Sequence, residues 1–185
     1  MKRALALLGL LTLLAGAAHA GPTADAEAAL DKDDTERAFA LYTQAVAEAG
    51  KDPGARASAL FDRAEVYARY GKNAEALADY DDALSLAPDP AFKALVLTSR
   101  GDLYAQTRRF QEAIADYSLA LSLKPDLVGV LTARGQAHQR LRDNDAALAD
   151  FDAELKANPG YPKALRARAR LLGQPDPTYV PEHPD

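Results

Sequence analysis

Apolar and small residues recur along the chain at spacings of three and four, which place them on one face of a helix. Residues 57–90 hold two such stripes, the first made of Leu60, Ala64 and Tyr67 and the second of Ala76, Leu77, Tyr80, Ala83 and Leu84. Gly71 separates the stripes and Pro88 follows the second, and both residue types interrupt helices. The pattern predicts two helices joined by a short turn.

The same two-stripe pattern returns in residues 94–127 and 128–161, which are blocks of equal length. Five positions match across the three blocks: Leu60, Leu97 and Leu131; Ala64, Gly101 and Gly135; Ala76, Ala113 and Ala147; Tyr80, Tyr117 and Phe151; and Pro88, Pro125 and Pro159. A single helical hairpin cannot bury its apolar stripe alone, whereas stacked hairpins bury theirs against each other. The chain is therefore predicted to be a stack of helical hairpins.

Less regular segments flank the three blocks. A weaker copy covers residues 23–50, with a first helix at 23–30 and a second stripe of Ala38, Phe39, Tyr42, Ala45 and Val46. The inserted residues 91–93 are expected to lengthen the next helix, with Asp89 as its N-cap and Pro90 as its first residue. Residues 162–172 predict a capping helix that ends the repeat domain (21–172), and the proline-rich residues 173–185 predict an extended or disordered tail.

The order of large, small, aromatic and proline positions over residues 57–161 resembles the tetratricopeptide repeat (TPR) family. The resemblance implies an all-α, right-handed superhelical solenoid with three full repeats, one degenerate N-terminal repeat and a C-terminal capping helix. The third block departs from its sisters because His138 stands at a tyrosine position and Glu154 at an alanine position. Looser packing or contact with water is expected at Glu154.

The resemblance also implies that the first helix of each repeat lines a concave groove that binds a protein or an extended peptide. The groove residues it implies are Phe61, Glu65, Arg69, Leu95, Thr98, Asp102, Thr132, Gln136, Gln139 and Arg140. Phe61 is the candidate aromatic anchor, or else it is half-buried by the degenerate repeat. The expected partner segment carries an apolar residue near Phe61, a basic residue near Glu65 and Asp102, and polar groups towards Arg140. The Lys, Asn and Arg side chains with which some TPR domains hold a terminal carboxylate are absent from the matching positions.

Each block also holds an arginine sixteen residues before an aspartate: Arg63 and Asp79, Arg100 and Asp116, and Arg134 and Asp150. In an antiparallel hairpin these two positions lie at similar heights. The degenerate repeat has Asp25 and Leu41 at the matching positions, so both partners are missing together. A ladder of ligand-binding charges is one interpretation, but identical recurrence in every repeat favours ion pairs that fix helix register.

The amino-acid composition argues against several classes of function and binding site. The formal charge of −5 gives no support to nucleic-acid binding, and the absence of cysteine excludes disulfides and thiolate metal sites. The few histidines are isolated, and no phosphate-binding loop or catalytic constellation is present. The sequence therefore predicts a chain that is not an enzyme and has no catalytic residue, metal site or cofactor.

Residues 1–20 have the layout of a secretory signal peptide: a basic start, an apolar run from Ala4 to Ala18, and small residues at Ala18 and Ala20. The apolar run is too short for the roughly 20 residues that span a bilayer. We expect cleavage before Gly21, a periplasmic or secreted product, and no integral membrane segment afterwards.

Two functions are consistent with these features. The first is an exported, non-catalytic scaffold that mediates protein–protein interaction. The alternative is a structural, self-associating subunit of a periplasmic assembly. Acidic residues 25–36 and basic residues 163–170 lie at opposite ends of the repeat domain, so copies could stack head to tail.

Overall fold

The computed structural model describes residues 22–179. The predicted signal peptide and residues 180–185 of the predicted tail lie outside the described residues. The described part contains nine α-helices and no strand, which confirms the predicted all-α repeat fold. The helices are α1 (Pro22–Leu30), α2 (Thr35–Glu48), α3 (Pro53–Arg69), α4 (Asn73–Leu86), α5 (Pro90–Gln106), α6 (Phe110–Leu123), α7 (Val130–Arg140), α8 (Asn144–Ala157) and α9 (Pro162–Leu171).

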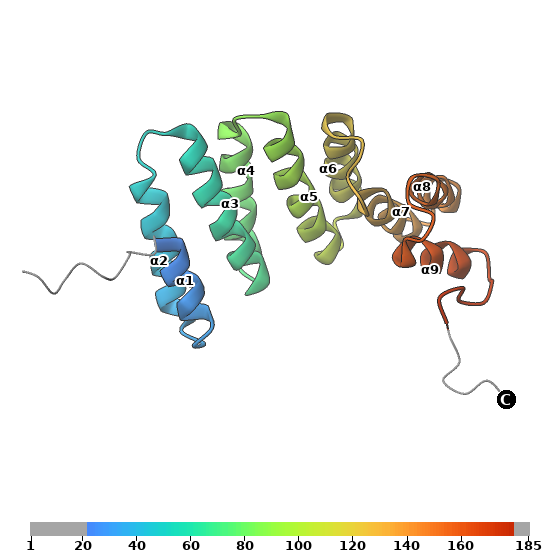
Figure 1. Ribbon diagram of the computed structural model, residues 1–185, viewed down its shortest axis with the longest axis horizontal. Helices are drawn as coiled ribbons and strands as arrows, with labels where there is room; N and C mark the ends of the chain where they lie inside the picture. Colours follow the sequence, from blue (N-terminus) through green and yellow to red (C-terminus); the bar gives the residue numbers. More distant parts are fainter. Residues whose placement is uncertain (1–21, 180–185) are drawn as a thin grey trace, which may run out of the picture.

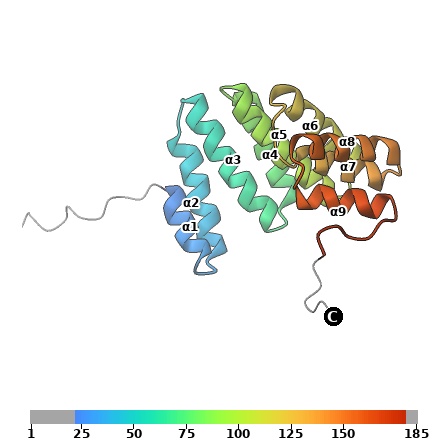
Figure 2. The ribbon, with the colours of Figure 1, turned by 45° about the vertical axis from the view of Figure 1, so that its right-hand side comes forward.

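The helices form consecutive antiparallel hairpins, with α9 closing the C-terminal end (Figure 1). Helices α3, α5, α7 and α9 each contact the next in this series. Within residues 22–179 the even-numbered helices make no comparable contacts with one another. Helices α3, α5, α7 and α9 therefore form the inner, more closely spaced layer of a curved stack, which can be followed in the turned view (Figure 2).

Local sequence explains where the long inner helices begin. Asp52 and Asp89 each precede a proline that opens a helix, and each carboxylate accepts a hydrogen bond from a free backbone N–H of the first turn. The Asp89 carboxylate accepts from the Phe92 N–H at 2.9 Å. The predicted lengthening of the helix by residues 91–93 is therefore confirmed, and it brings Phe92 onto α5.

The ring at the centre of each second helix packs against a small residue on the first helix. Tyr80, Tyr117 and Phe151 are almost fully buried. A Cβ atom added at Gly135 would lie 2.7 Å from the Phe151 ring and 3.1 Å from the Ala147 carbonyl oxygen. At Gly101 it would lie 2.8 Å from the Tyr117 ring. Close packing therefore favours glycine at these two positions, whereas the first full repeat has Ala64 opposite Tyr80.

Gly135→Ala is expected to lower the free energy of unfolding by about 1–2 kcal/mol. Overpacking of a core costs roughly 1–3 kcal/mol, and the better helix propensity of alanine returns up to about 1 kcal/mol. Denaturant titration followed by circular dichroism measures the change. Gly160→Ala is the control, because no atom lies within 4 Å of its added Cβ. Equal stability of the two variants would contradict the packing account.

The structure confirms that the three predicted arginine–aspartate pairs are in contact. In each pair Nε and Nη2 of the arginine donate to the two carboxylate oxygens of the aspartate, at 2.6–2.9 Å. The hydrogen bond to Asp116 is the main cause that raises the pKa of Arg100 above its ordinary value. These bidentate pairs join the two helices of each hairpin.

The remaining nitrogen of each arginine reaches the preceding hairpin. Nη1 of Arg63 donates to Thr43, that of Arg100 to Asp81 and that of Arg134 to Ser118. These acceptors directly follow Tyr42, Tyr80 and Tyr117. On α9, Arg168 donates to Asp152, which follows Phe151 in the same way, at 2.6 Å. Arg63, Arg100 and Arg134 therefore link neighbouring repeats as well as the two helices of their own repeat, and Arg168 links α9 to the third repeat.

The expectation for Glu154 was wrong. Its side chain is only 1% exposed, and it accepts hydrogen bonds from the Gly129 backbone N–H and the Asn158 side-chain amide. Gly129 is the N-cap of α7 and has no side chain with which to cap the helix. Glu154 accepts from the N–H of this N-cap residue itself, so the glutamate at an alanine position links the end of α8 to the start of α7.

The described part of the tail is also more ordered than expected. Residues 174–179 turn back, with the Asp176 carboxylate accepting bonds from the N–H and hydroxyl of Thr178. Arg166 on α9 donates to the same hydroxyl at 3.3 Å. The prolines alone predicted an extended segment, but the Asp–Pro–Thr sequence forms a turn against the capping helix.

Candidate functional site

Three adjoining hollows run along the inner layer of helices. The first, of about 270 Å³, lies between α3 and α5 and is lined by residues that include Glu65, Arg69 and Asp102. The second, of about 280 Å³, lies where α5 meets the loop before α7 and the start of α9. The third, of about 860 Å³, is an open hollow bordered by α5, the start of α6, α7 and α9. Asp102 lines all three, so the hollows meet at this residue and together make up the groove.

All but two of the predicted groove residues line these hollows. Those that do are Glu65, Arg69, Thr98, Asp102, Thr132, Gln136, Gln139 and Arg140. Thr132 is only 2% exposed, and its hydroxyl has no hydrogen-bond partner among the described residues, so it offers a partner almost no surface. Leu95 is 47% exposed but lines none of the three hollows.

Phe61 also lies outside the three hollows, because other rings cover it. Its ring centroid is 5.8 Å from that of Phe92 and 6.2 Å from that of Tyr80, and the side chain is half-buried. The covering rings come from α4 and α5, and Ala45 and Val46 of the degenerate repeat belong to the core cluster against which Phe61 packs. The three inserted residues brought Phe92 to this position, and their one large apolar side chain was the sequence signal for this contact.

A tyrosine hydroxyl holds each of the two groove carboxylates in place. The Tyr80 hydroxyl donates to Glu65 at 2.5 Å, and the Tyr117 hydroxyl donates to Asp102 at 2.6 Å. Burial, followed by these bonds, raises the pKa of both tyrosines above the ordinary value. The third repeat has Gln136 and Phe151 at the matching positions, so acid and hydroxyl are lost together. This recurring fifteen-residue spacing could have identified the pairs from sequence.

Asp102 is the electrostatic centre of the groove. Partial burial raises the pKa of its carboxyl above the ordinary value, and the negative charge of Glu65 adds to the rise. The hydrogen bond from Tyr117 and the positive charge of Lys163 oppose it. A cationic partner stabilises the charged form of such a partly desolvated carboxylate.

Charge changes sign along the groove. At the α3 end, the first hollow is lined by two acids, Glu65 and Asp102, and one base, Arg69. At the α9 end, the largest hollow is lined by Arg108, Arg140 and Arg170, with Asp102 as its one acidic lining residue. An acidic chain therefore places an excess of cations in the largest of these three hollows.

Neither a metal-binding cluster nor a membrane-spanning helix occurs in the part of the chain that the structure describes. Residues 22–179 contain no group of three or more His, Asp or Glu side chains arranged to hold a metal ion. In the same range, no helix is long and apolar enough to cross a membrane. His138, the departure noted in the third block, lies 3.3 Å from the Asp143 carboxylate at the turn into α8.

Comparison with known proteins gives a family match and similar folds. Residues 15–133 match the model of the tetratricopeptide repeat-like domain family. No curated protein is similar enough in sequence to count as a match.

Several solved structures share the architecture. A tetratricopeptide repeat protein from Parabacteroides merdae has a TM-score of 0.71 at 24% identity, over 82% of this chain and 59% of that one. The crystal structure of MamA has a TM-score of 0.68 at 17% identity, over 80% and 82% of the two chains. The second TPR domain of human RPAP3, in complex with the HSP70 peptide SGPTIEEVD, has a TM-score of 0.59 at 25% identity, over 65% and 98%.

Proposed function

The chain belongs to the tetratricopeptide repeat-like domain family, and from this premise we propose that it is a non-catalytic module that binds a partner protein through an extended segment. The observation that carries the proposal is the groove along α3, α5 and α7, in which three hollows meet at Asp102. The peptide complex of the similar RPAP3 domain supports this mode of binding.

The chemistry of the groove favours a partner residue of positive charge near its centre. Glu65 and Asp102 are fixed by tyrosine hydroxyls, so their remaining carboxylate oxygens are already oriented. A lysine or arginine of the partner can pair with them without further ordering of the protein, which lowers the entropic cost of binding. Exposed Gln136 and half-exposed Gln139 can bond the backbone of an extended segment.

Asp102→Asn is expected to weaken binding of such a segment by about tenfold or more. Hydrogen bonds to charged groups contribute roughly 1.5–3 kcal/mol, and 1.4 kcal/mol corresponds to tenfold in affinity. The asparagine oxygen still accepts the Tyr117 bond, so the fold should be retained. Segments chosen from a peptide array are measured by fluorescence anisotropy.

Asp126→Asn, in the exposed loop before α7, is the matched control and should bind like the unchanged protein. Binding should also weaken on acidification. Because the pKa of Asp102 is raised, its charge is lost at a higher pH than that of an ordinary aspartate. Failure of the array to yield any segment, or equal affinity of both variants, would contradict the proposal.

We further propose that the protein is exported to the periplasm or the medium. The support is the basic start, apolar run and small residues of the first twenty positions. Protein recovered from the cell exterior or periplasm is expected to begin at Gly21 when its N-terminus is sequenced. A start at Met1 would overturn this part of the proposal.

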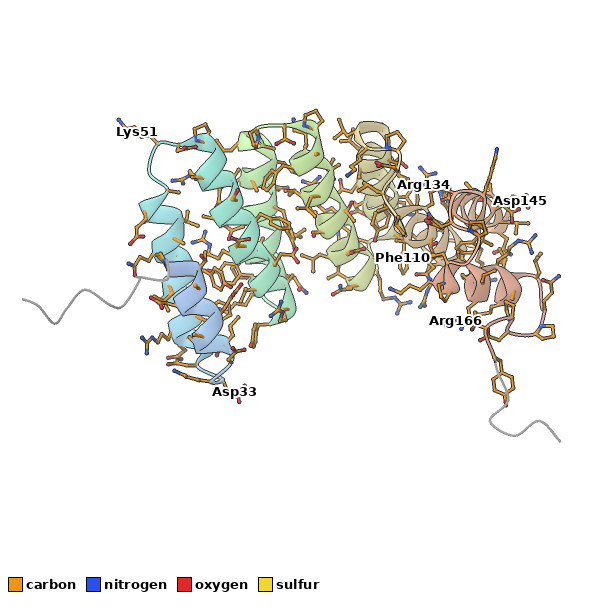
Figure 3. All side chains as sticks on the ribbon, viewed as in Figure 1. Asp33, Lys51, Phe110, Arg134, Asp145 and Arg166 are labelled. Carbon is orange, nitrogen blue, oxygen red and sulfur yellow. The ribbon has the colours of Figure 1, made fainter. Side chains whose placement is uncertain are left out.

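Head-to-tail self-association is the second candidate. Figure 3 shows Asp33 and Arg166 at opposite ends of the molecule. Exposed acidic side chains surround Asp33, and exposed basic side chains surround Arg166. Such contacts weaken with salt because exposed charges are screened. Sedimentation at low and high salt separates the candidates: a monomer at low salt excludes self-association, and larger species that dissociate at high salt support it.

A further inference from the structure

We propose that the large hollow between α5, α7 and α9 is a binding site for an acidic segment of the partner protein. This inference rests on the proposed function and adds a second recognition site to it. The hollow lies at the C-terminal end of the groove, beyond Asp102, and includes residues of the capping helix that the family resemblance did not place in the groove.

The hollow is large enough for several side chains. Its volume of about 860 Å³ falls within the 300–1,000 Å³ typical of ligand sites. Small side chains account for the free volume, since the lining residues include Ala105, Ala133, Ala137 and Ala167. Phe110 forms part of the wall from the start of α6 (Figure 3).

The arginines of this hollow differ from the other arginines of the repeats. Arg63, Arg100, Arg134 and Arg168 each have an aspartate partner, and these pairs hold the repeats together. Among residues 22–179, Arg108, Arg140 and Arg170 form no ion pair within 4.0 Å. Three arginines without an ion-pair partner among the described residues therefore line one hollow.

Carboxylates are the ligands that fit this donor set. A guanidinium group matches the two oxygens of a carboxylate, and Gln106, Gln136 and Gln139 add amide donors around the same hollow. Asp102 cannot neutralise all three arginines, and one of its oxygens already accepts from Tyr117. The occupant is therefore a segment with several Asp or Glu side chains.

The site makes one orientation of a bound partner segment more favourable than the reverse. A partner segment with basic residues at Glu65 and Asp102 and acidic residues towards α9 satisfies both ends, whereas the reversed order places like charges together. Like-charge contacts disfavour wrong partners and wrong orientations, in addition to the attraction of opposite charges in the right one.

The turn after α5 offers a sharp test. Arg108 and Arg142 occupy the same turn position in successive repeats and have left-handed backbones, with φ of 64° and 65°. The first full repeat has Gly71 there. Replacement of either arginine by glycine removes backbone strain, so neither variant should unfold. Arg108 lines the hollow and Arg142 does not.

The probe is dye-labelled, C-terminally amidated hexaglutamate, measured by fluorescence anisotropy with hexaglutamine as the uncharged control. We expect the unchanged protein to bind hexaglutamate but not hexaglutamine. Arg140→Gln and Arg108→Gly should each weaken hexaglutamate binding by about tenfold, and Arg142→Gly by less than about twofold. Asp102→Asn should strengthen it, the opposite of its expected effect on basic segments.

Three outcomes would overturn the inference: no binding of hexaglutamate, equal losses in Arg108→Gly and Arg142→Gly, or Arg140-dependent self-association, which would make a second copy the occupant. If hexaglutamate fails while array segments still bind in an Asp102-dependent way, the acidic-segment site is excluded and the proposed function stands. If no array segment binds at all, the proposed function itself fails.

Discussion

Arg100→Ala is expected to lower the free energy of unfolding by about 3 kcal/mol. The change leaves Asp116, whose side chain is only 8% exposed, without its bidentate partner, and it also removes the link to Asp81 in the preceding repeat. Breaking a buried ion pair by removal of one partner costs roughly 3–5 kcal/mol, because the other charge stays buried. Denaturant titration monitored by circular dichroism measures the loss.

A double-mutant cycle isolates the contact itself. Arg100→Ala combined with Asp116→Ala should cost less than the sum of the single changes, with a coupling of roughly 1–3 kcal/mol. Arg109→Ala is the matched control, because its pair with Glu112 is nearly half exposed on both sides and should contribute at most about 1 kcal/mol. Additive losses at Arg100 and Asp116 would mean that the pair does not stabilise the hairpin.

Phe61→Ala is expected to cost about 2–3 kcal/mol of stability. Full truncation of a buried phenylalanine costs roughly 3–5 kcal/mol, and Phe61 is half-buried against Tyr80, Phe92 and the surrounding core. Thermal and denaturant unfolding measure the loss. Leu95→Ala removes an exposed side chain and should change stability by less than about 0.5 kcal/mol.

The same two variants test whether Phe61 is also an anchor for the partner. Binding is measured at a temperature where both variants are folded. An anchor of this kind contributes about 2 kcal/mol or more, so its loss weakens affinity roughly thirtyfold. Lower stability with unchanged binding would assign Phe61 to the core alone.

Much of the fold could be predicted from the sequence, because three blocks of one chain served as their own alignment. Gly135 and Phe151 recur as a small residue and a ring because the two pack directly against each other. The spacing of Arg134 and Asp150 recurs because each hairpin has the same length. Features that lie within one hairpin therefore appear as fixed spacings.

Features between hairpins were harder to find. Arg63 reaches Thr43 over 20 residues, Arg100 reaches Asp81 over 19 and Arg134 reaches Ser118 over 16. Loops of different length change these separations while the structure keeps the contact. A search at fixed spacing cannot recognise such a link, although all the acceptors directly follow an aromatic residue.

The candidate site shows the same limit. Residues on the inner helices were predicted from their repeat positions, and most of them line the groove. Arg108, Phe110 and Arg170 were missed because they belong to a turn, to the start of an outer helix and to the capping helix. Their meeting depends on the curvature of the whole stack. Burial of Phe61 and Thr132 likewise depends on neighbours that the repeat pattern does not include.

The central claim is that a partner segment binds along the inner helices, and site-specific photo-crosslinking tests it most directly. A photoreactive p-benzoylphenylalanine replaces Gln136, which is exposed in the groove, or Gln44, which is exposed on the outer helix α2. With a segment selected from the array, we predict strong crosslinking at position 136 and none above background at position 44. Crosslinking at position 44 but not at 136 would contradict the account.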